Sequence, residues 1–194
     1  MREENSSKIR LAIFASGSGS NAEAIIRHFS DNPIVTVELI ITNRKDAGVI
    51  DRANRLGVSC KHVPKSAFED QDAILGMLKS ENIDWIILAG WLLLVPTYLV
   101  RNYPDRIINI HPALLPKFGG KGMYGMHVHE AVAEAGETES GITIHLVNER
   151  FDEGRILAQF KFPLPITVTP AVVEAGVREL ELLHYASEIE KTVL

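Results

Sequence analysis

The chain has 194 residues, a net charge of −5, and a single cysteine, Cys60. This acidic balance argues against a nucleic-acid partner, and one cysteine excludes an intrachain disulfide and a cysteine-based zinc cluster. No apolar run approaches the ~18 residues of a membrane span, so we expect no membrane partner. The length and the 46% hydrophobic content predict a single domain over residues 1–194. Residues 1–7 are polar and lack the apolar region of a signal peptide, so we interpret them as a loose tail and expect a cytoplasmic protein.

Apolar segments alternate with helical patterns through the first ninety residues. The strands are expected at residues 9–15, 35–42, 59–63 and 85–89, and the helices at 22–29, 47–56 and 70–80. Ser20 or Asn21 is the expected N-cap of the first helix, and Gly57 ends the second. Continuous apolar strands separated by helices predict an α/β fold: a doubly wound, mostly parallel sheet with helices on both faces.

The second half of the chain has a different pattern. We expect a short helix at 96–102, a strand at 107–110, a glycine- and lysine-rich lid at 116–124 and a helix at 126–135. A half-buried strand at 141–147 and a strand at 156–162 then form an antiparallel hairpin at the C-terminal edge of the sheet. A helix from Pro170 to about Glu190 follows, capped by Thr167 or Thr169.

Asn109 and His111 interrupt the apolar strand that Pro112 ends. Residues two apart on an extended backbone point to the same side, so the amide and the imidazole are expected side by side. Together they can hold a polarised carbonyl and move a proton. The alternative is a core histidine beside a turn asparagine.

A second feature is the segment from Gly17 to Asn21, Gly-Ser-Gly-Ser-Asn, between a strand and a helix. Glycines allow close approach of the backbone, and a helix N-terminus attracts anions, so the segment predicts a site for the phosphate of a small molecule. A turn without a ligand and an NAD site are alternatives. The NAD site is disfavoured because Asn43 stands where a ribose-binding acid is expected.

An aspartate and three histidines are further candidates for the site. Asp152, in a charged turn, can orient a histidine and raise its pKa, although aspartate is also common in turns. His127 and His129 do not share a helical face and lack a third ligand, so no metal site is expected. His145, on an alternating strand, is interpreted as structural.

These motifs together closely resemble the phosphoribosylglycinamide formyltransferases, a family of folate-dependent formyltransferases. The resemblance covers residues 8–185 and is carried by Ser16–Asn21, Leu88-Ala-Gly90, Asn109-Ile-His-Pro-Ala-Leu-Leu-Pro116, His127-Val-His129, Gly141-Ile-Thr and Asp152-Glu-Gly154. It implies the formyltransferase fold. It also implies transfer of a formyl group from the co-substrate 10-formyltetrahydrofolate to the amine of 5-phosphoribosylglycinamide, in de novo purine (IMP) biosynthesis, without a metal.

The resemblance also implies roles for individual residues. Asn109, His111 and Asp152 match the catalytic trio, in which Asn109 and a protonated His111 stabilise the oxyanion. The phosphate would bind Gly19, Ser20 and Asn21, and the ribose would bind Glu181, with Tyr185 behind it. The folate would lie against Leu92, Leu93, Leu94 and Val95, against Asn109, and against Asn148, Glu149, Arg150, Phe151 and Asp152.

The chain departs from the family pattern at two folate contacts, where Leu93 and Gln71 replace arginines, and its lid is longer. Other formyltransferases with the same trio, a formyl-folate deformylase and a non-catalytic phosphate-binding module are alternatives. The first two usually carry a further domain, and the third leaves the trio without a joint role. The family includes monomers and homodimers, and both states stay open.

Overall fold

The computed structural model describes residues 8–194, which form two compact units with main parts 8–91 and 92–192. The expected loose tail at residues 1–7 lies outside the described residues. The strands lie in the order β3 (Ser59–His62), β2 (Val35–Thr42), β1 (Ile9–Phe14), β4 (Trp85–Leu88), β5 (Ile107–His111), β6 (Glu139–Leu146) and β7 (Ile156–Pro163). Three consecutive pairs, β3–β2, β2–β1 and β1–β4, are parallel, and β6 is antiparallel to both β5 and β7. The predicted fold class is confirmed.

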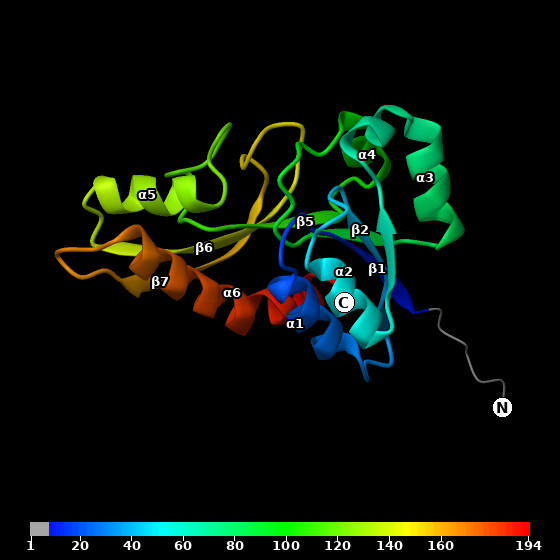
Figure 1. The fold of residues 1–194 in the computed structure, drawn as a ribbon, viewed down its shortest axis with the longest axis horizontal. Helices are drawn as coiled ribbons and strands as arrows, with labels where there is room; N and C mark the ends of the chain where they lie inside the picture. Colours follow the sequence, from blue (N-terminus) through cyan, green and yellow to red (C-terminus); the bar gives the residue numbers. More distant parts are fainter. Residues whose placement is uncertain (1–7) are drawn as a thin grey trace. The chain divides into compact units, whose positions relative to one another are not determined.

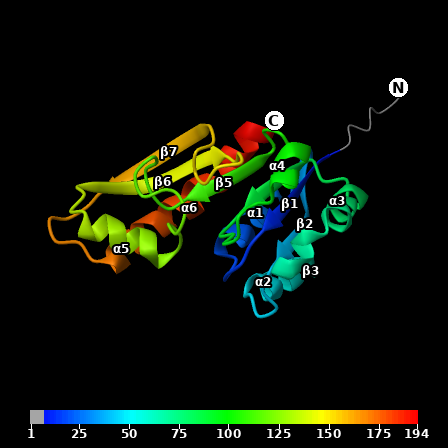
Figure 2. The ribbon, with the colours of Figure 1, turned by 90° about the horizontal axis from the view of Figure 1, so that it is seen from above.

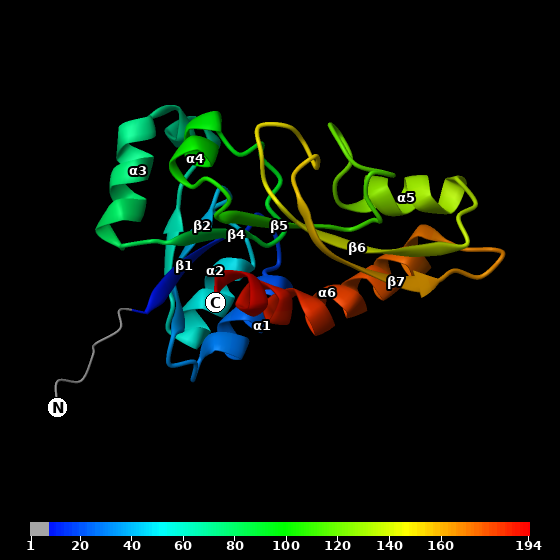
Figure 3. The same cartoon turned by 180° about the vertical axis from the view of Figure 1, so that it is seen from behind.

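The first unit has the alternation of strands and helices that its sequence predicts (Figure 1). Its elements are β1 (Ile9–Phe14), α1 (Ser20–Phe29), β2 (Val35–Thr42), α2 (Val49–Leu56), β3 (Ser59–His62), η1 (Lys65–Glu69), α3 (Gln71–Ser80) and β4 (Trp85–Leu88). Helices α1 and α2 cover one face of these strands and α3 covers the other (Figure 3). The β-branched and other apolar residues of β1 and β2 therefore pack between two helical layers, and Leu11, Ile13, Leu39 and Ile41 are fully buried.

The helix ends in this unit follow local chemistry. Gly57 ends α2 in the left-handed conformation, at φ 71°, as predicted. Asp70 caps α3, because its carboxylate accepts the Ala73 N–H at 3.0 Å. The predicted cap of α1 is wrong: Gly19 occupies the N-cap position, at φ 80°, and no side chain caps the helix. The 3₁₀-helix η1 was not predicted.

The second unit combines three antiparallel strands with three helices, all of which are labelled in Figure 2. Its elements are α4 (Thr97–Asn102), β5 (Ile107–His111), α5 (Met126–Glu134), β6 (Glu139–Leu146), β7 (Ile156–Pro163) and α6 (Pro170–Val193). The predicted hairpin is β6 and β7. Thr169 caps α6, its hydroxyl accepting from Val172 N–H at 3.4 Å, and the helix continues past the expected Glu190.

Two expectations for this unit need correction. Strand β6 is not half-buried, because only its first residue, Glu139, is exposed. Helices α5 and α6 lie on opposite sides of these strands, so polar as well as apolar side chains of β6 are enclosed (Figure 1). Strand β5 also extends one residue beyond the expected end and includes His111.

Among residues 8–194, no helix is long and apolar enough to cross a membrane.

Candidate active site

Asn109 and His111 project from the end of β5 onto the face that β6 shares. In the antiparallel pairing, Asn109 lies opposite His145 and His111 lies opposite Thr143. Paired residues across a ladder point to the same side of the sheet, so four polar side chains gather on one buried surface. The predicted side-by-side placement of the amide and the imidazole follows from this register.

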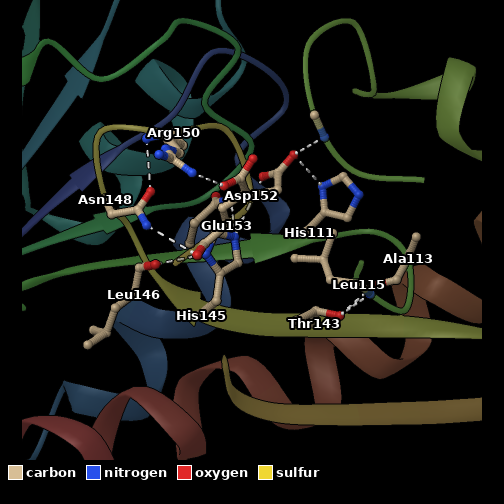
Figure 4. A network of polar contacts seen from close by, with 12 residues as sticks. His111, Ala113, Leu115, Thr143, His145, Leu146, Asn148, Arg150, Asp152 and Glu153 are labelled. Atoms are coloured by element: carbon tan, nitrogen blue, oxygen red, sulfur yellow. Dashed lines mark hydrogen bonds and ion pairs between the residues drawn. The ribbon is translucent and has the colours of Figure 1, made fainter. Parts of the chain in front are cut away.

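His111 is almost fully buried, and both of its ring nitrogens have polar neighbours. Its Nε2 lies 2.7 Å from the carbonyl oxygen of Phe118. Because a carbonyl can only accept, Nε2 carries a proton and donates it. Its Nδ1 faces Oδ2 of Asp152 at 3.6 Å, a charge pair whenever the ring is protonated. The structure therefore brings the predicted histidine and aspartate together, as Figure 4 shows.

Asp152 lies in the turn between β6 and β7 and adopts a left-handed backbone conformation, at φ 54°. Its carboxylate accepts the Gly120 N–H at 2.9 Å, and its other oxygen lies 3.7 Å from Nε2 of His145. Burial raises the pKa of Asp152, but the nearby His145 and His111 rings and the Gly120 N–H more than offset it, so the net pKa is lowered. Asp152 is thus a stable anion between two buried imidazoles.

The pKa of His111 moves opposite to the predicted direction. Burial lowers it, and the charge of Asp152 and the Phe118 carbonyl offset this only in part, so the net pKa falls below the ordinary 6.5. The charge support from Asp152 is present, as expected, but burial outweighs it. The imidazole is therefore mainly neutral at pH 7, with its proton on Nε2.

His145, which the sequence interpretation treats as structural, belongs to the same network. Its Nδ1 donates to the carbonyl of Leu146 at 2.9 Å, which leaves Nε2 of the neutral ring to accept from the Asn109 amide at 3.1 Å. The ring thereby fixes the Asn109 side chain and leaves its second N–H available. The signal in the sequence is the alternation of β6, which places Thr143 and His145 on one face.

The segment after His111 is held by a buried threonine, also unpredicted. The Thr143 hydroxyl donates to the Ala113 carbonyl at 2.7 Å and accepts the Leu115 N–H at 2.9 Å. Gln159 donates to both the Leu115 carbonyl and the Thr143 hydroxyl, each at 2.9 Å. These bonds anchor the chain between β5 and the predicted lid, in the region drawn in Figure 4.

The predicted phosphate segment lies in the first unit, at the start of α1. Gly19 is the N-cap, and Ser20 and Asn21 are the first helical residues. The N–H groups of a first helical turn have no intrahelical acceptor and carry the positive end of the dipole. With no capping side chain, this helix end retains the features of an anion site.

The remaining predicted site residues lie in the second unit. Glu181 is half-buried on α6. Burial raises the pKa of Tyr185, and the nearby Glu181 carboxylate raises it further. Tyr185 donates to the Ile108 carbonyl at 3.2 Å. This contact links the helix that carries Glu181 to the strand that carries Asn109 and His111.

The two predicted folate segments are the stretch before α4 and the turn after β6. Leu92 and Leu94 are exposed, Leu93 is half-buried and Val95 is buried. In the turn, Asn148, Glu149, Arg150 and Phe151 are exposed. Arg101 of α4 pairs with Glu149 at 3.1 Å. This pair connects the helix that follows the first folate segment with the turn that forms the second.

His127 and His129 take different environments on α5. His127 is exposed and pairs with Glu130 at 3.4 Å, whereas His129 is buried and its Nδ1 has no hydrogen-bond partner. Within residues 8–194, no group of three histidine, cysteine or acidic side chains could hold a metal ion.

Residues 9–189 match the family model described as formyl transferase. The chain therefore belongs to the formyl transferase family, and the predicted resemblance is confirmed. Its relatives include proteins named phosphoribosylglycinamide formyltransferase. The one from Bacillus subtilis (strain 168) is 34% identical, over 94% of this chain and 93% of its own length. The chloroplastic one from Arabidopsis thaliana is 47% identical, over 77% of this chain.

The chain spans 53% and 60% of the lengths of two plant relatives, from Arabidopsis thaliana and Vigna unguiculata. Among solved structures, phosphoribosylglycinamide formyltransferase from Streptococcus pneumoniae TIGR4 is 33% identical with a TM-score of 0.84, and the match covers 96% of this chain and 99% of that one. Glycinamide ribonucleotide transformylase 1 from Geobacillus kaustophilus is 36% identical with a TM-score of 0.84, over 93% and 96% of the two chains.

Proposed function

We propose that this protein transfers the formyl group of 10-formyltetrahydrofolate to the amine of 5-phosphoribosylglycinamide, a step of de novo purine (IMP) biosynthesis. The observation that carries the proposal is the contact of His111 with Asp152 beside Asn109, on a chain whose relatives bear the name of this activity. The folate is the formyl donor, and the reaction needs no metal because a formyl group on nitrogen is already electrophilic.

The three side chains fit the steps of formyl transfer. The amine attacks the formyl carbon and a tetrahedral oxyanion forms. The N–H of Asn109 that does not bond to His145 is available to donate to that oxyanion, and one such donor contributes about 10²–10³ in rate. Asp152, anionic and half-buried, stabilises positive charge on His111 when the ring accepts a proton.

The protonation state of His111 decides the order of proton transfer. A mainly neutral imidazole accepts a proton from the attacking amine at Nδ1, and the resulting imidazolium is paired with Asp152. The same ring then donates a proton to the leaving folate nitrogen, a general-acid role worth about 10²–10⁴. Because Nε2–H donates to the Phe118 carbonyl, substrate reaches Nε2 only when that bond opens.

The binding residues and assembly form the rest of the proposal. The substrate phosphate binds Gly19, Ser20 and Asn21, and Glu181 binds its ribose. The folate contacts residues 92–95 and 148–152 together with Asn109. The two compact units serve one formyltransferase domain, active as a monomer or a homodimer. The cytoplasm is the proposed location, although two plant relatives are named chloroplastic.

The absorbance of released folate product tests the function. We expect product only when 10-formyltetrahydrofolate and 5-phosphoribosylglycinamide are both present. Product without the ribonucleotide would instead identify a deformylase, and no product in either case would refute the proposed transfer. Titration with formyl-folate alone separates the phosphate-binding module, which should not bind it.

A further inference from the structure

We propose that Arg52 is a positioning residue for the substrate phosphate: it fixes the backbone of the loop Gly17–Ser20 by bonding the Ser18 carbonyl and the Glu23 carboxylate together. The inference rests on the proposed phosphate site at Gly19–Asn21 and assigns a role to a residue of another helix, α2. Arg52 acts through the loop and is not proposed to contact the phosphate.

Three consecutive carbonyl groups of the loop are held by donors of the protein. The Gly17 carbonyl accepts the Val49 N–H at 3.2 Å, and the Gly19 carbonyl accepts the Glu23 N–H at 2.9 Å. Between them, the Ser18 carbonyl accepts Nε–H of Arg52 at 2.7 Å. A carbonyl oxygen facing a phosphate would repel it. Holding all three fixes where the adjacent N–H groups point.

Arg52 provides the only side-chain donor among these three, and its planar guanidinium group makes two contacts at once. One terminal nitrogen pairs with Oε2 of Glu23, in the first turn of α1, while Nε holds Ser18. The guanidinium fork therefore ties the loop to both helices. A lysine carries the same charge but cannot reproduce the two directed bonds of the fork.

Glu23 would be unfavourable beside a bound phosphate without its arginines. It pairs with Arg27 at 2.8 Å, with Arg55 at 2.7 Å and with Arg52. Three cations surround one carboxylate, so the local charge is positive and favours an approaching anion. Arg55 shares this charge role on the same helix and bonds Glu23, but within residues 8–194 it makes no hydrogen bond to a carbonyl of the loop, which makes it a matched control.

Close packing of α2 against the loop also restricts the loop's conformation. A side chain at Gly48, just before α2, would place its Cβ 3.2 Å from Cα of Ser18, and one at Gly19 would lie 2.7 Å from Cβ of Val49. The N-terminus of α2 is thus packed directly against the loop. Arg52, one turn further along α2, extends this contact to the Ser18 carbonyl.

The test compares Arg52→Gln, Arg52→Lys and Arg55→Gln in binding and in turnover. Calorimetric titration with 5-phosphoribosylglycinamide and with the ribonucleoside that lacks its phosphate isolates the phosphate contribution. We expect Arg52→Gln to weaken ribonucleotide binding about 10-fold, a size typical of one charged hydrogen bond, and to leave ribonucleoside binding unchanged. Arg52→Lys should recover part of the loss, and Arg55→Gln should change binding less than 3-fold.

The inference would be overturned if Arg52→Gln and Arg55→Gln weakened ribonucleotide binding equally. It would also be overturned if Arg52→Gln weakened binding of the ribonucleoside as much as binding of the ribonucleotide. A wild-type protein that binds both compounds alike would overturn it as well. Thermal unfolding of each variant identifies a general loss of folding. Binding is measured without the folate. If the wild-type protein bound the ribonucleotide but showed no turnover, the proposed formyl transfer would be refuted. The role of Arg52 would still be decided by the binding of the variants.

Discussion

The glycine-rich loop of the first unit and the histidine cluster of the second present polar groups in different ways. The loop offers backbone N–H groups, and local bonds and close packing against α2 hold its conformation. The cluster offers side chains from β5, β6 and the following turn; burial lowers the pKa of His111, and neighbouring polar groups outweigh burial to lower that of Asp152. An added methyl group should therefore destabilise the loop, whereas the cluster should lose activity when a charge or a donor is removed.

Asp152→Asn should give the largest effect, a loss of about 10²–10⁴ in kcat. The amide keeps the shape of the side chain but removes the charge that stabilises a protonated His111. Steady-state turnover measures the loss, and thermal unfolding checks the fold. Glu153→Gln is the matched control, because the neighbouring Glu153 is exposed and pairs with Arg150. Near-full turnover of Asp152→Asn, or an equal loss in Glu153→Gln, would contradict the assigned role.

For the loop we predict the opposite behaviour: adding an uncharged methyl group should destabilise the protein. Gly19→Ala should destabilise the fold by about 3 kcal/mol, combining left-handed strain of about 1–2 kcal/mol with overpacking against Val49. Urea unfolding measures the change.

The matched control for this prediction is Gly57→Ala. Gly57 is also left-handed, at φ 71°, but a Cβ there would meet no atom within 4 Å, so strain alone should cost about 1 kcal/mol. Equal losses at the two positions would show that packing against α2 contributes nothing.

These two regions also differ in how far the sequence predicts them. The loop could be located because adjacent residues form it, at a recognisable strand-to-helix junction. Its cap was still misassigned, because a serine or an asparagine is the commoner choice and only the packing of Val49 shows why glycine is used. Local pattern therefore predicted the position of the loop but not its conformation.

The cluster could be predicted only in part. Asn109 and His111 share a face by spacing alone, but their meeting with Asp152 depends on a turn more than forty residues later. His145 was interpreted as structural because strand alternation does not show that Asn109 is its partner. The pKa of His111 was predicted in the wrong direction because the sequence suggests a charge partner without giving the depth of burial.

A smaller effect is expected from acid. The pKa values of His111 and His129 are lowered, mainly by burial, so the unfolded chain binds their protons more readily than the folded protein. The free energy of unfolding should be constant above about pH 7 and fall as the pH drops below the ordinary value of 6.5. The lowered pKa of Asp152 adds a further loss below its ordinary 3.8.

Urea unfolding at pH 5 to 8 measures this dependence. His129→Gln should flatten the decline below pH 6.5, because it removes one of the two rings whose pKa is lowered. The control is His127→Gln, which removes an exposed ring from the same helix. A decline unchanged by His129→Gln would show that its ring does not contribute.

The smallest effects should come from the helix caps, one in each unit. Asp70→Ala should destabilise the protein by about 1 kcal/mol, because the carboxylate bonds the Ala73 N–H at 3.0 Å. Thr169→Ala should cost about 0.5 kcal/mol: its hydroxyl bond to Val172 is longer, at 3.4 Å, and the same N–H also reaches the Thr169 carbonyl at 3.0 Å. Urea unfolding measures both changes, and Asp70→Asn, which retains a capping oxygen, is the control. If Thr169→Ala cost as much as Asp70→Ala, the backbone bond could not be substituting for the hydroxyl.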